Sequence, residues 1–180
     1  GNLGKLTTFG GYSPTDNSYI ARVLPTFTIN KYISLTPGYA FFQDYESKSE
    51  NAEHQIMAYA TFTLPISNKL SITDRNMYYY QIKNYASNTV TYRNRLGLNY
   101  KIKVKDIPVS LYAHDEIYIN LENGKFRNRV YVGSSISLSW LTPQLMYYMQ
   151  SEKGKTNKHY WMLSLLVPLE KFGFFSGKKK

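Results

Sequence analysis

The residues of this chain that could carry acid–base, metal or nucleophilic chemistry are few and far apart. The 180 residues include three histidines, His54, His114 and His159, and no cysteine. The histidine spacing matches no metal-binding motif, and without cysteine there is no thiolate metal site, cysteine nucleophile or disulfide framework. We therefore predict a non-enzymatic protein with no catalytic residue, metal site or cofactor.

Nucleophilic catalysis would need a serine beside a histidine, and the best local candidate is Ser110 with His114. These two residues share one face of an alternating segment, where four residues of extended chain span about 13 Å. That distance exceeds hydrogen-bond reach, so a serine on a neighbouring segment, such as Ser135, would have to serve instead. The sequence also lacks a glycine-rich phosphate loop, a nucleophile elbow and a calcium loop.

Arginines within alternating segments form the other candidate site. Arg93 and Arg95 lie on the polar side of one segment, Arg127 and Arg129 share that parity in another, and Glu116 lies on the polar side between them. We expect Glu116 to pair with Arg95 or Arg129, because a lone buried guanidinium is costly. The predicted network of inward-facing charges is Arg22, Arg75, Arg93, Arg95, His114, Glu116, Arg127 and Arg129.

The elements that would hold these side chains are long β-strands. Apolar and polar residues alternate with a period of two, most clearly over 90–102, where only Asn94 interrupts the apolar side. The spacing of turn residues predicts ten strands and an all-β fold. Their expected ranges are 3–12, 17–29, 32–44, 54–65, 70–83, 89–103, 107–120, 126–138, 141–151 and 158–169.

The length and connection of these strands favour an antiparallel up-and-down transmembrane β-barrel. The segments run to about 10–14 residues, past the usual 5 or 6 of soluble proteins and close to what a tilted strand needs to cross a bilayer. Short turns alternate with longer polar loops, as in outer-membrane barrels. We predict one barrel domain over 1–175, a basic tail over 176–180, and both termini in the periplasm.

Aromatic and charged residues support the same interpretation. The chain has 18 Tyr, 9 Phe, 2 Trp and a net charge of +10. Aromatics fall near the predicted strand ends, where outer-membrane barrels carry aromatic girdles, and lysines collect at the short-turn end. Because these lysines do not line one exposed sheet face, we expect no nucleic-acid partner. No apolar run is long enough for a membrane-spanning helix.

Three segments together resemble domain-of-unknown-function family 2490, which consists of uncharacterised bacterial outer-membrane proteins. They are an arginine-rich strand at 92–96 (YRNRL), an Asp-Glu strand at 112–119 (YAHDEIYI) and an Asn-Arg strand that ends in glycine at 126–133 (FRNRVYVG). The resemblance implies an outer-membrane barrel of undefined role, and it assigns no catalytic residue.

The resulting hypothesis is a structural or accessory subunit of a bacterial outer-membrane assembly, with its narrow lumen plugged by an Arg/Glu/Tyr network. Its expected partners are outer-membrane lipid, lipopolysaccharide and other outer-membrane proteins. One alternative is a small anion-selective channel or anion-binding barrel. A second alternative is a soluble lipocalin-like carrier, in which the apolar side of residues 90–102 would point inward.

Overall fold

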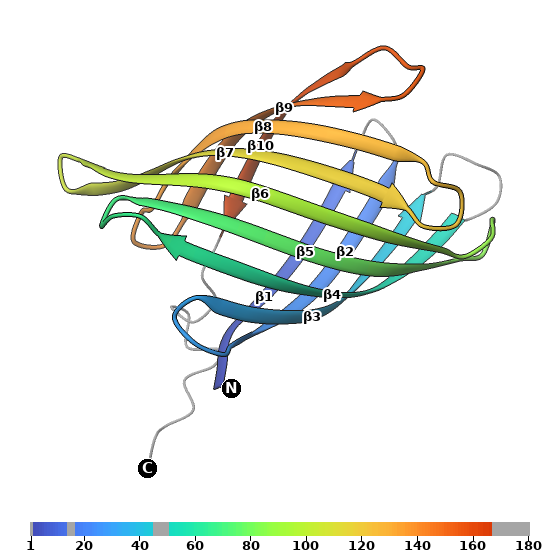
Figure 1. Cartoon of the computed structure of the whole chain (residues 1–180), viewed down its shortest axis with the longest axis horizontal. Coiled ribbons are helices and arrows are strands. Elements are labelled where there is room, and N and C mark those ends of the chain that lie inside the picture. The colour runs from blue at the N-terminus through green and yellow to red at the C-terminus, as the bar shows by residue number, and fades with distance from the viewer. Residues whose placement is uncertain (1, 14–16, 45–50, 167–180) are drawn as a thin grey trace.

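The computed structural model describes residues 2–13, 17–44 and 51–166, and these residues form one sheet of ten strands (Figure 1). The strands hold 9 to 16 residues each. They are β1 (Asn2–Ser13), β2 (Ser18–Thr28), β3 (Ile33–Asp44), β4 (Asn51–Pro65), β5 (Leu70–Lys83), β6 (Thr89–Val104), β7 (Ile107–Asn120), β8 (Phe126–Ile136), β9 (Thr142–Glu152) and β10 (Lys158–Leu166). The described part of the chain contains no helix with the length and apolar character that a membrane crossing requires.

Each strand pairs with the next along the chain, and all nine pairings are antiparallel. The sequence-based prediction of ten up-and-down strands is therefore confirmed. Every described boundary lies within three residues of its predicted position, and the last three residues of the segment predicted over 158–169 lie outside the described residues. The proposed basic tail, 176–180, also lies outside them.

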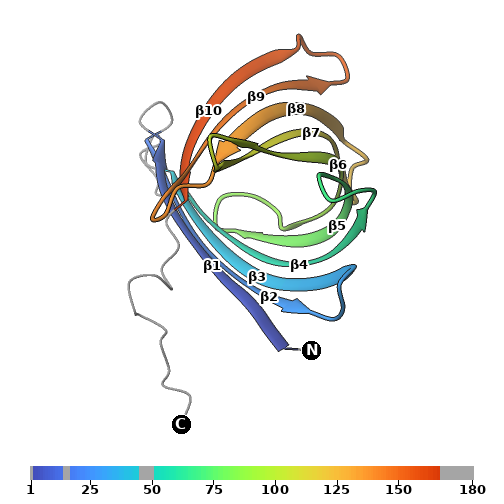
Figure 2. The ribbon, with the colours of Figure 1, turned by 90° about the vertical axis from the view of Figure 1, so that its left-hand side faces the viewer.

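The sheet curls strongly along its width and takes the form of a half-barrel (Figure 2). Within the described residues, β1 pairs only with β2 and β10 pairs only with β9. The strand order thus leaves one edge at each end of the sheet. The start of β1 and the end of β10 lie at the same end as the short turns, since Asn2 pairs with Thr28 and Leu166 with Thr142.

Proline and the turns set the local details of pairing. Pro25 and Pro37 lie on facing strands, and the β2–β3 ladder is interrupted between the Val23–Tyr39 and Phe27–Leu35 pairs. Proline has no amide proton to donate to a ladder, so the interruption follows from the sequence. A hydrogen bond between the Thr26 and Thr36 hydroxyl groups, 2.9 Å long, bridges this gap.

The two ends of the sheet differ less in connection length than we expected. The turns at 29–32, 66–69, 105–106 and 137–141 hold two to five residues, while the described loops 84–88, 121–125 and 153–157 hold five each. The tightest turn has positive φ at both central residues, 47° at Lys105 and 66° at Asp106. Such a turn matches the twist of the flanking strands, which explains how two residues suffice there.

The two faces of the sheet differ sharply in polarity. On β6, Leu96 and Leu98 point to the convex outer face and are 53% and 46% exposed, whereas Arg93 and Arg95 point to the concave inner face. Other strands repeat this alternation. Large outward side chains that are at least 40% exposed include Tyr19, Val23, Leu35, Tyr39, Ile56, Phe62, Tyr78, Tyr80, Tyr100, Leu111, Phe126, Val130, Val132, Leu145, Trp161 and Leu163.

Candidate functional site

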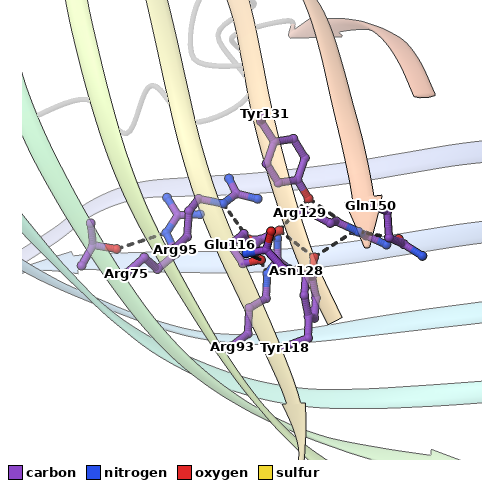
Figure 3. Close-up of polar contacts among 10 residues, drawn as sticks. Arg75, Arg93, Arg95, Glu116, Tyr118, Asn128, Arg129, Tyr131 and Gln150 are labelled. Carbon is purple, nitrogen blue, oxygen red and sulfur yellow. Dashed lines mark hydrogen bonds and ion pairs between the residues drawn. The ribbon is translucent and has the colours of Figure 1, made fainter. Parts of the chain in front are cut away.

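Glu116 on β7 lies at the centre of the concave face and is fully buried, with 0% exposure. One of its carboxylate oxygens, Oε1, forms ion pairs with Arg93 and with Arg95, whose Nε lies 2.6 Å away (Figure 3). The other oxygen accepts hydrogen bonds from the hydroxyl groups of Tyr118, at 2.7 Å, and Tyr131, at 2.6 Å. Four donors from three strands therefore surround one carboxylate (Figure 3).

Strand parity predicts Arg95 or Arg129 as the partner of Glu116, and the structure contains the pair with Arg95, whereas Arg129 binds elsewhere. Although Arg129 lies directly opposite Glu116 on β8, its Nε donates to Gln150 Oε1 at 2.7 Å and its Nη1 to the Tyr118 hydroxyl at 2.9 Å. The tyrosine hydroxyl groups already occupy the Glu116 oxygen on that side. Arg93, which is diagonal to Glu116, takes the second ion pair instead.

The ring of Tyr118 is a second centre of the cluster. The guanidinium carbons of Arg127, Arg93 and Arg129 lie 4.6, 4.8 and 4.9 Å from its centroid. A tyrosine face attracts cations through its quadrupole, most strongly where water is excluded. Tyr118 is only 6% exposed, so its ring stabilises guanidinium groups that the single carboxylate cannot all pair with.

The remaining arginines of the predicted network have weaker partners. Arg75 donates from Nε to the Thr61 hydroxyl at 3.3 Å and lies 5.2 Å from the centroid of Tyr59. The Nε atoms of Arg22 and Arg127 are shielded from solvent, and neither donates a hydrogen bond within the described part of the chain. The structure thus places all six arginines on the concave face but joins only Arg93 and Arg95 to Glu116.

His114 lies next to this cluster without joining its hydrogen bonds. Its ring stacks on Tyr112 with centroids 5.1 Å apart, and its Nδ1 is buried with no partner among the described residues. Gly97 makes room for the ring, because a Cβ atom there would lie 2.6 Å from His114 Cδ2. His114 and Ser110 lie four residues apart on one strand, and no hydrogen bond joins them in the described structure.

The tyrosine and glutamine members of the cluster are the residues that the sequence-based site did not name. Tyr118 and Tyr131 lie two residues from Glu116 and Arg129 respectively, so the strand period places each pair on one face. Gln150 reaches the cluster through its pairing opposite Arg129. The alternation of side chains along each strand was therefore enough to predict that both tyrosines lie on the same face as the cluster.

At the loop end of the concave face, Glu53 collects another set of donors. Its carboxylate accepts hydrogen bonds from Gln81 Nε2 at 2.6 Å and from the Tyr85 hydroxyl at 3.3 Å. Partial burial and the adjacent Glu53 carboxylate raise the pKa of Tyr85. The raised pKa keeps the Tyr85 hydroxyl protonated, and so able to donate to Glu53, at more alkaline pH than an ordinary tyrosine.

The convex face carries a group of polar side chains at mid-strand, here called the outer polar belt. Asp74 Oδ1 accepts a hydrogen bond from Asn94 Nδ2 at 2.6 Å and Asp74 Oδ2 accepts one from Asn76 Nδ2 at 3.0 Å. Asn128 Nδ2 donates to Asp115 Oδ1 at 2.6 Å. The belt consists of Asp74, Asn76, Asn94, Asp115 and Asn128, on four adjacent strands from β5 to β8.

The chemistry that these groups offer is electrostatic. On the concave face, guanidinium and hydroxyl donors can hold an anion, while on the convex face two carboxylates and three amides can accept or donate hydrogen bonds to a polar partner. Within the described residues, no group of three or more His, Asp or Glu side chains is arranged to hold a metal ion.

The fold and the site define an all-β protein with an up-and-down sheet, an arginine-rich concave face and an apolar convex face. The chain belongs to the family described as Protein of unknown function (DUF2490), whose model matches residues 9–160. That match includes all three segments on which the resemblance rests. No curated protein and no solved structure matches the chain.

Proposed function

We propose that the protein is a non-enzymatic β-barrel of the bacterial outer membrane that works as a subunit of a larger assembly. The observation that supports a membrane location is the apolar convex face, which runs across strands of 9 to 16 residues. A soluble protein rarely exposes an apolar surface of this extent, whereas lipid favours it. In this proposal the short turns and both termini face the periplasm, and outer-membrane lipid and lipopolysaccharide surround the barrel.

The outer polar belt supports the role as a subunit. Asp74 is four residues after the first residue of β5, and Asp115 is eight residues after the first residue of β7. Both therefore belong to the part of the strands that would cross the bilayer. Carboxylate and amide groups that face hydrocarbon are costly, and polar residues at this depth normally contact protein. We infer that another membrane protein covers the belt.

The surface beside the belt suits such a contact. Shallow apolar hollows of about 430 and 350 Å³ lie next to Asp74 and Asp115, and Ile72 contributes to both. The belt holds two carboxylates and no cationic side chain, so the complementary partner surface carries Lys, Arg or amide donors between apolar side chains.

Site-specific photo-crosslinking in native membranes tests this proposal. A crosslinker at Asn94, within the belt, should capture a defined protein, whereas one at Ile56, an exposed convex-face residue of β4 that lines neither hollow, should capture lipid alone. Equal lipid labelling at both positions would remove the subunit role. Recovery of the exported native protein in the soluble fraction without detergent would remove the membrane location.

A soluble carrier and an open anion channel make less use of the observed geometry. A lipocalin-like carrier needs its apolar face inside, but Leu96 and Leu98 point to the convex side. An open anion channel needs water at mid-barrel, where Glu116, Tyr131 and Tyr118 are 0%, 3% and 6% exposed. About ten strands enclose little more space than side chains fill. Silent planar bilayers are therefore the expected result of a conductance measurement.

A further inference from the structure

The concave face carries more positive charge at mid-strand than its carboxylate neutralises. Six arginines project there, and Glu116 is the buried carboxylate among them. Its two oxygens are already occupied by Arg93, Arg95 and two tyrosine hydroxyl groups. The guanidinium groups of Arg22, Arg75 and Arg127 form no ion pair with a carboxylate in the described structure, although Arg127 lies opposite Glu152 on β9 and the two charges attract each other.

Two of the arginines contact one tyrosine ring, and a third projects from another part of the concave face. Arg127 on β8 and Arg93 on β6 lie 4.6 and 4.8 Å from the centroid of the Tyr118 ring. Arg22 comes from β2, on the other side of the curled sheet, and lies within electrostatic range of both Arg93 and Tyr118. The curl of the sheet turns the concave side of β2 toward that of β6 and β8, although these strands are not neighbours (Figure 2).

Two of these three arginines carry a buried donor atom without an acceptor in the part of the chain that the structure describes. Arg22 Nε and Arg127 Nε are shielded from solvent and donate no hydrogen bond within the described residues. Each buried donor without an acceptor destabilises the fold, and cations that approach one another in a region of low water content add repulsion. An anion bound between Arg22, Arg93 and Arg127 would supply acceptors and countercharge together.

We propose that these three arginines form a binding site for a phosphate-type oxyanion on the concave face. The planar guanidinium fork matches the oxygen geometry of phosphate and binds it through paired hydrogen bonds. A phosphate carries up to two negative charges, which suits a site with three cations better than the single charge of a carboxylate. The ligand is either free phosphate or the phosphate group of a lipid or lipopolysaccharide.

This inference goes beyond the proposed membrane role and does not depend on it. The arginines face the concave side of the curled sheet whatever surrounds the convex side. A failure of phosphate binding would therefore leave the crosslinking result intact, and a soluble protein could still bind phosphate here.

A thermal-stability titration of the purified, folded protein with inorganic phosphate tests the site. At constant ionic strength set with sodium chloride, phosphate should raise the Tm of the wild-type protein in a saturable manner. Arg22→Gln and Arg127→Gln should each weaken the apparent affinity at least about tenfold, because each loses a charged hydrogen-bond donor. Arg22→Lys should fall in between, since it keeps the charge but loses the fork.

The control variant Lys105→Gln makes the same charge change in the β6–β7 turn and should bind phosphate as the wild type does. In phosphate-free buffer, Arg22→Gln should melt no lower than the wild type, because it removes a cation without a partner. A lower Tm for Arg22→Gln in that buffer, or a wild-type response equal to that of added chloride, would overturn the proposal.

Solvent extraction of protein purified from native membranes separates the sources of the ligand. Stoichiometric phosphorus in the organic phase would identify a phospholipid. Aqueous phosphorus that reacts with molybdate directly would identify free phosphate, and aqueous phosphorus that reacts only after acid digestion would identify lipopolysaccharide. Any of these results should disappear in Arg127→Gln and remain in Lys105→Gln. Absence of protein-bound phosphorus together with a flat titration would rule the site out.

Discussion

Glu116 determines how the charges on the concave face are arranged. It is the buried acceptor for two arginines and two tyrosines, and its 0% exposure leaves water no access to the carboxylate. A buried ion pair of this kind gives little net stability compared with an apolar core, but the removal of one partner leaves an uncompensated charge. The cluster should therefore be far more sensitive to the loss of Glu116 than to the loss of any single arginine.

Replacement of the carboxylate tests this view. Glu116→Gln leaves Arg93 and Arg95 without their countercharge and should lower the free energy of unfolding by about 3–5 kcal/mol. The measurement is a urea titration in detergent micelles, followed by the fluorescence of Trp140 and Trp161. The matched control is Asp106→Asn, which removes a carboxylate from an exposed turn and places asparagine at a positive φ that it tolerates.

The control should change stability by no more than about 0.5 kcal/mol. Equal effects of Glu116→Gln and Asp106→Asn on stability would show that water or a rearranged tyrosine solvates Arg93 and Arg95 once the carboxylate charge is removed. The interpretation of Glu116 as the organising residue would then be wrong.

Sequence parity predicts which residues face the cluster, but it does not predict their partners. Alternation places Glu116, Arg93 and Arg95 on one face, because a strand turns successive side chains to opposite sides. The choice of Arg93 over Arg129 as the second ion pair depends on where the Tyr118 and Tyr131 hydroxyl groups lie, which no pattern in the sequence specifies. Asn94 and Asp115 interrupt the apolar pattern in sequence, and the structure shows that both belong to the outer polar belt.

At the scale of the strands, two glycines allow aromatic rings to lie flat against the sheet. Gly97 pairs with His114, and a Cβ at Gly97 would lie 2.6 Å from the His114 ring. Gly133 pairs with Tyr112, and a Cβ there would lie 2.6 Å from the Tyr112 hydroxyl oxygen. Aromatic side chains that cover glycines on a neighbouring strand fix the register of a sheet.

Gly97→Ala should lower the free energy of unfolding by about 1–3 kcal/mol, because the new methyl group overlaps His114 and Thr73. The double variant Gly97→Ala/His114→Ala should recover part of that loss, since the smaller side chain frees the space. The control is Gly10→Ala on β1, where the nearest atom lies 4.0 Å from the added Cβ. Additive effects in the double variant would contradict this packing role.

The strands could be predicted to within three residues because almost every one has one apolar and one polar face. The alternation holds even where prolines interrupt pairing, since Pro25 and Pro37 keep the extended backbone while they remove donors. Connection lengths differ most between β8 and β9, where five residues replace the expected two because β8 ends at Ile136 and β9 begins at Thr142. The tight turn expected between 103 and 107 is present as Lys105 and Asp106, although neither is a glycine or asparagine that would signal positive φ.

At the scale of the whole molecule, the proposed membrane partner on the convex face can be tested by a change to the outer polar belt. Asp115→Leu/Asn128→Leu replaces a hydrogen-bonded pair of the belt by apolar side chains. In isolation this variant should be more stable in micelles, by about 1 kcal/mol or more, because polar groups no longer face hydrocarbon. In native membranes it should fail to co-purify with the membrane protein that we propose covers the belt of the wild type.

Ser134→Leu, which makes a similar change on the convex face of β8 outside the belt, should retain that partner. Loss of the partner in both variants would show that any added leucine disturbs assembly. Retention of the partner in both would assign the interface to another part of the convex face.

The edges of the sheet determine whether the half-barrel can reside in a bilayer unaided. In hydrocarbon, each unpaired backbone amide or carbonyl group costs several kcal/mol, so the edges of β1 and β10 that are free in the described sheet must pair with each other or with strands from a partner.

Because the sequence contains no cysteine, closure can be tested with a disulfide, in which Thr8→Cys on β1 is combined with one cysteine at His159, Trp161, Leu163 or Leu165 on β10. If the barrel closes on itself, one combination should form an intramolecular disulfide upon oxidation in membranes, because paired strands bring Cα atoms within the 4.4–6.8 Å that a disulfide spans. Disulfides only between different chains would mean that closure requires a second molecule, and the single-chain barrel would be the wrong architecture.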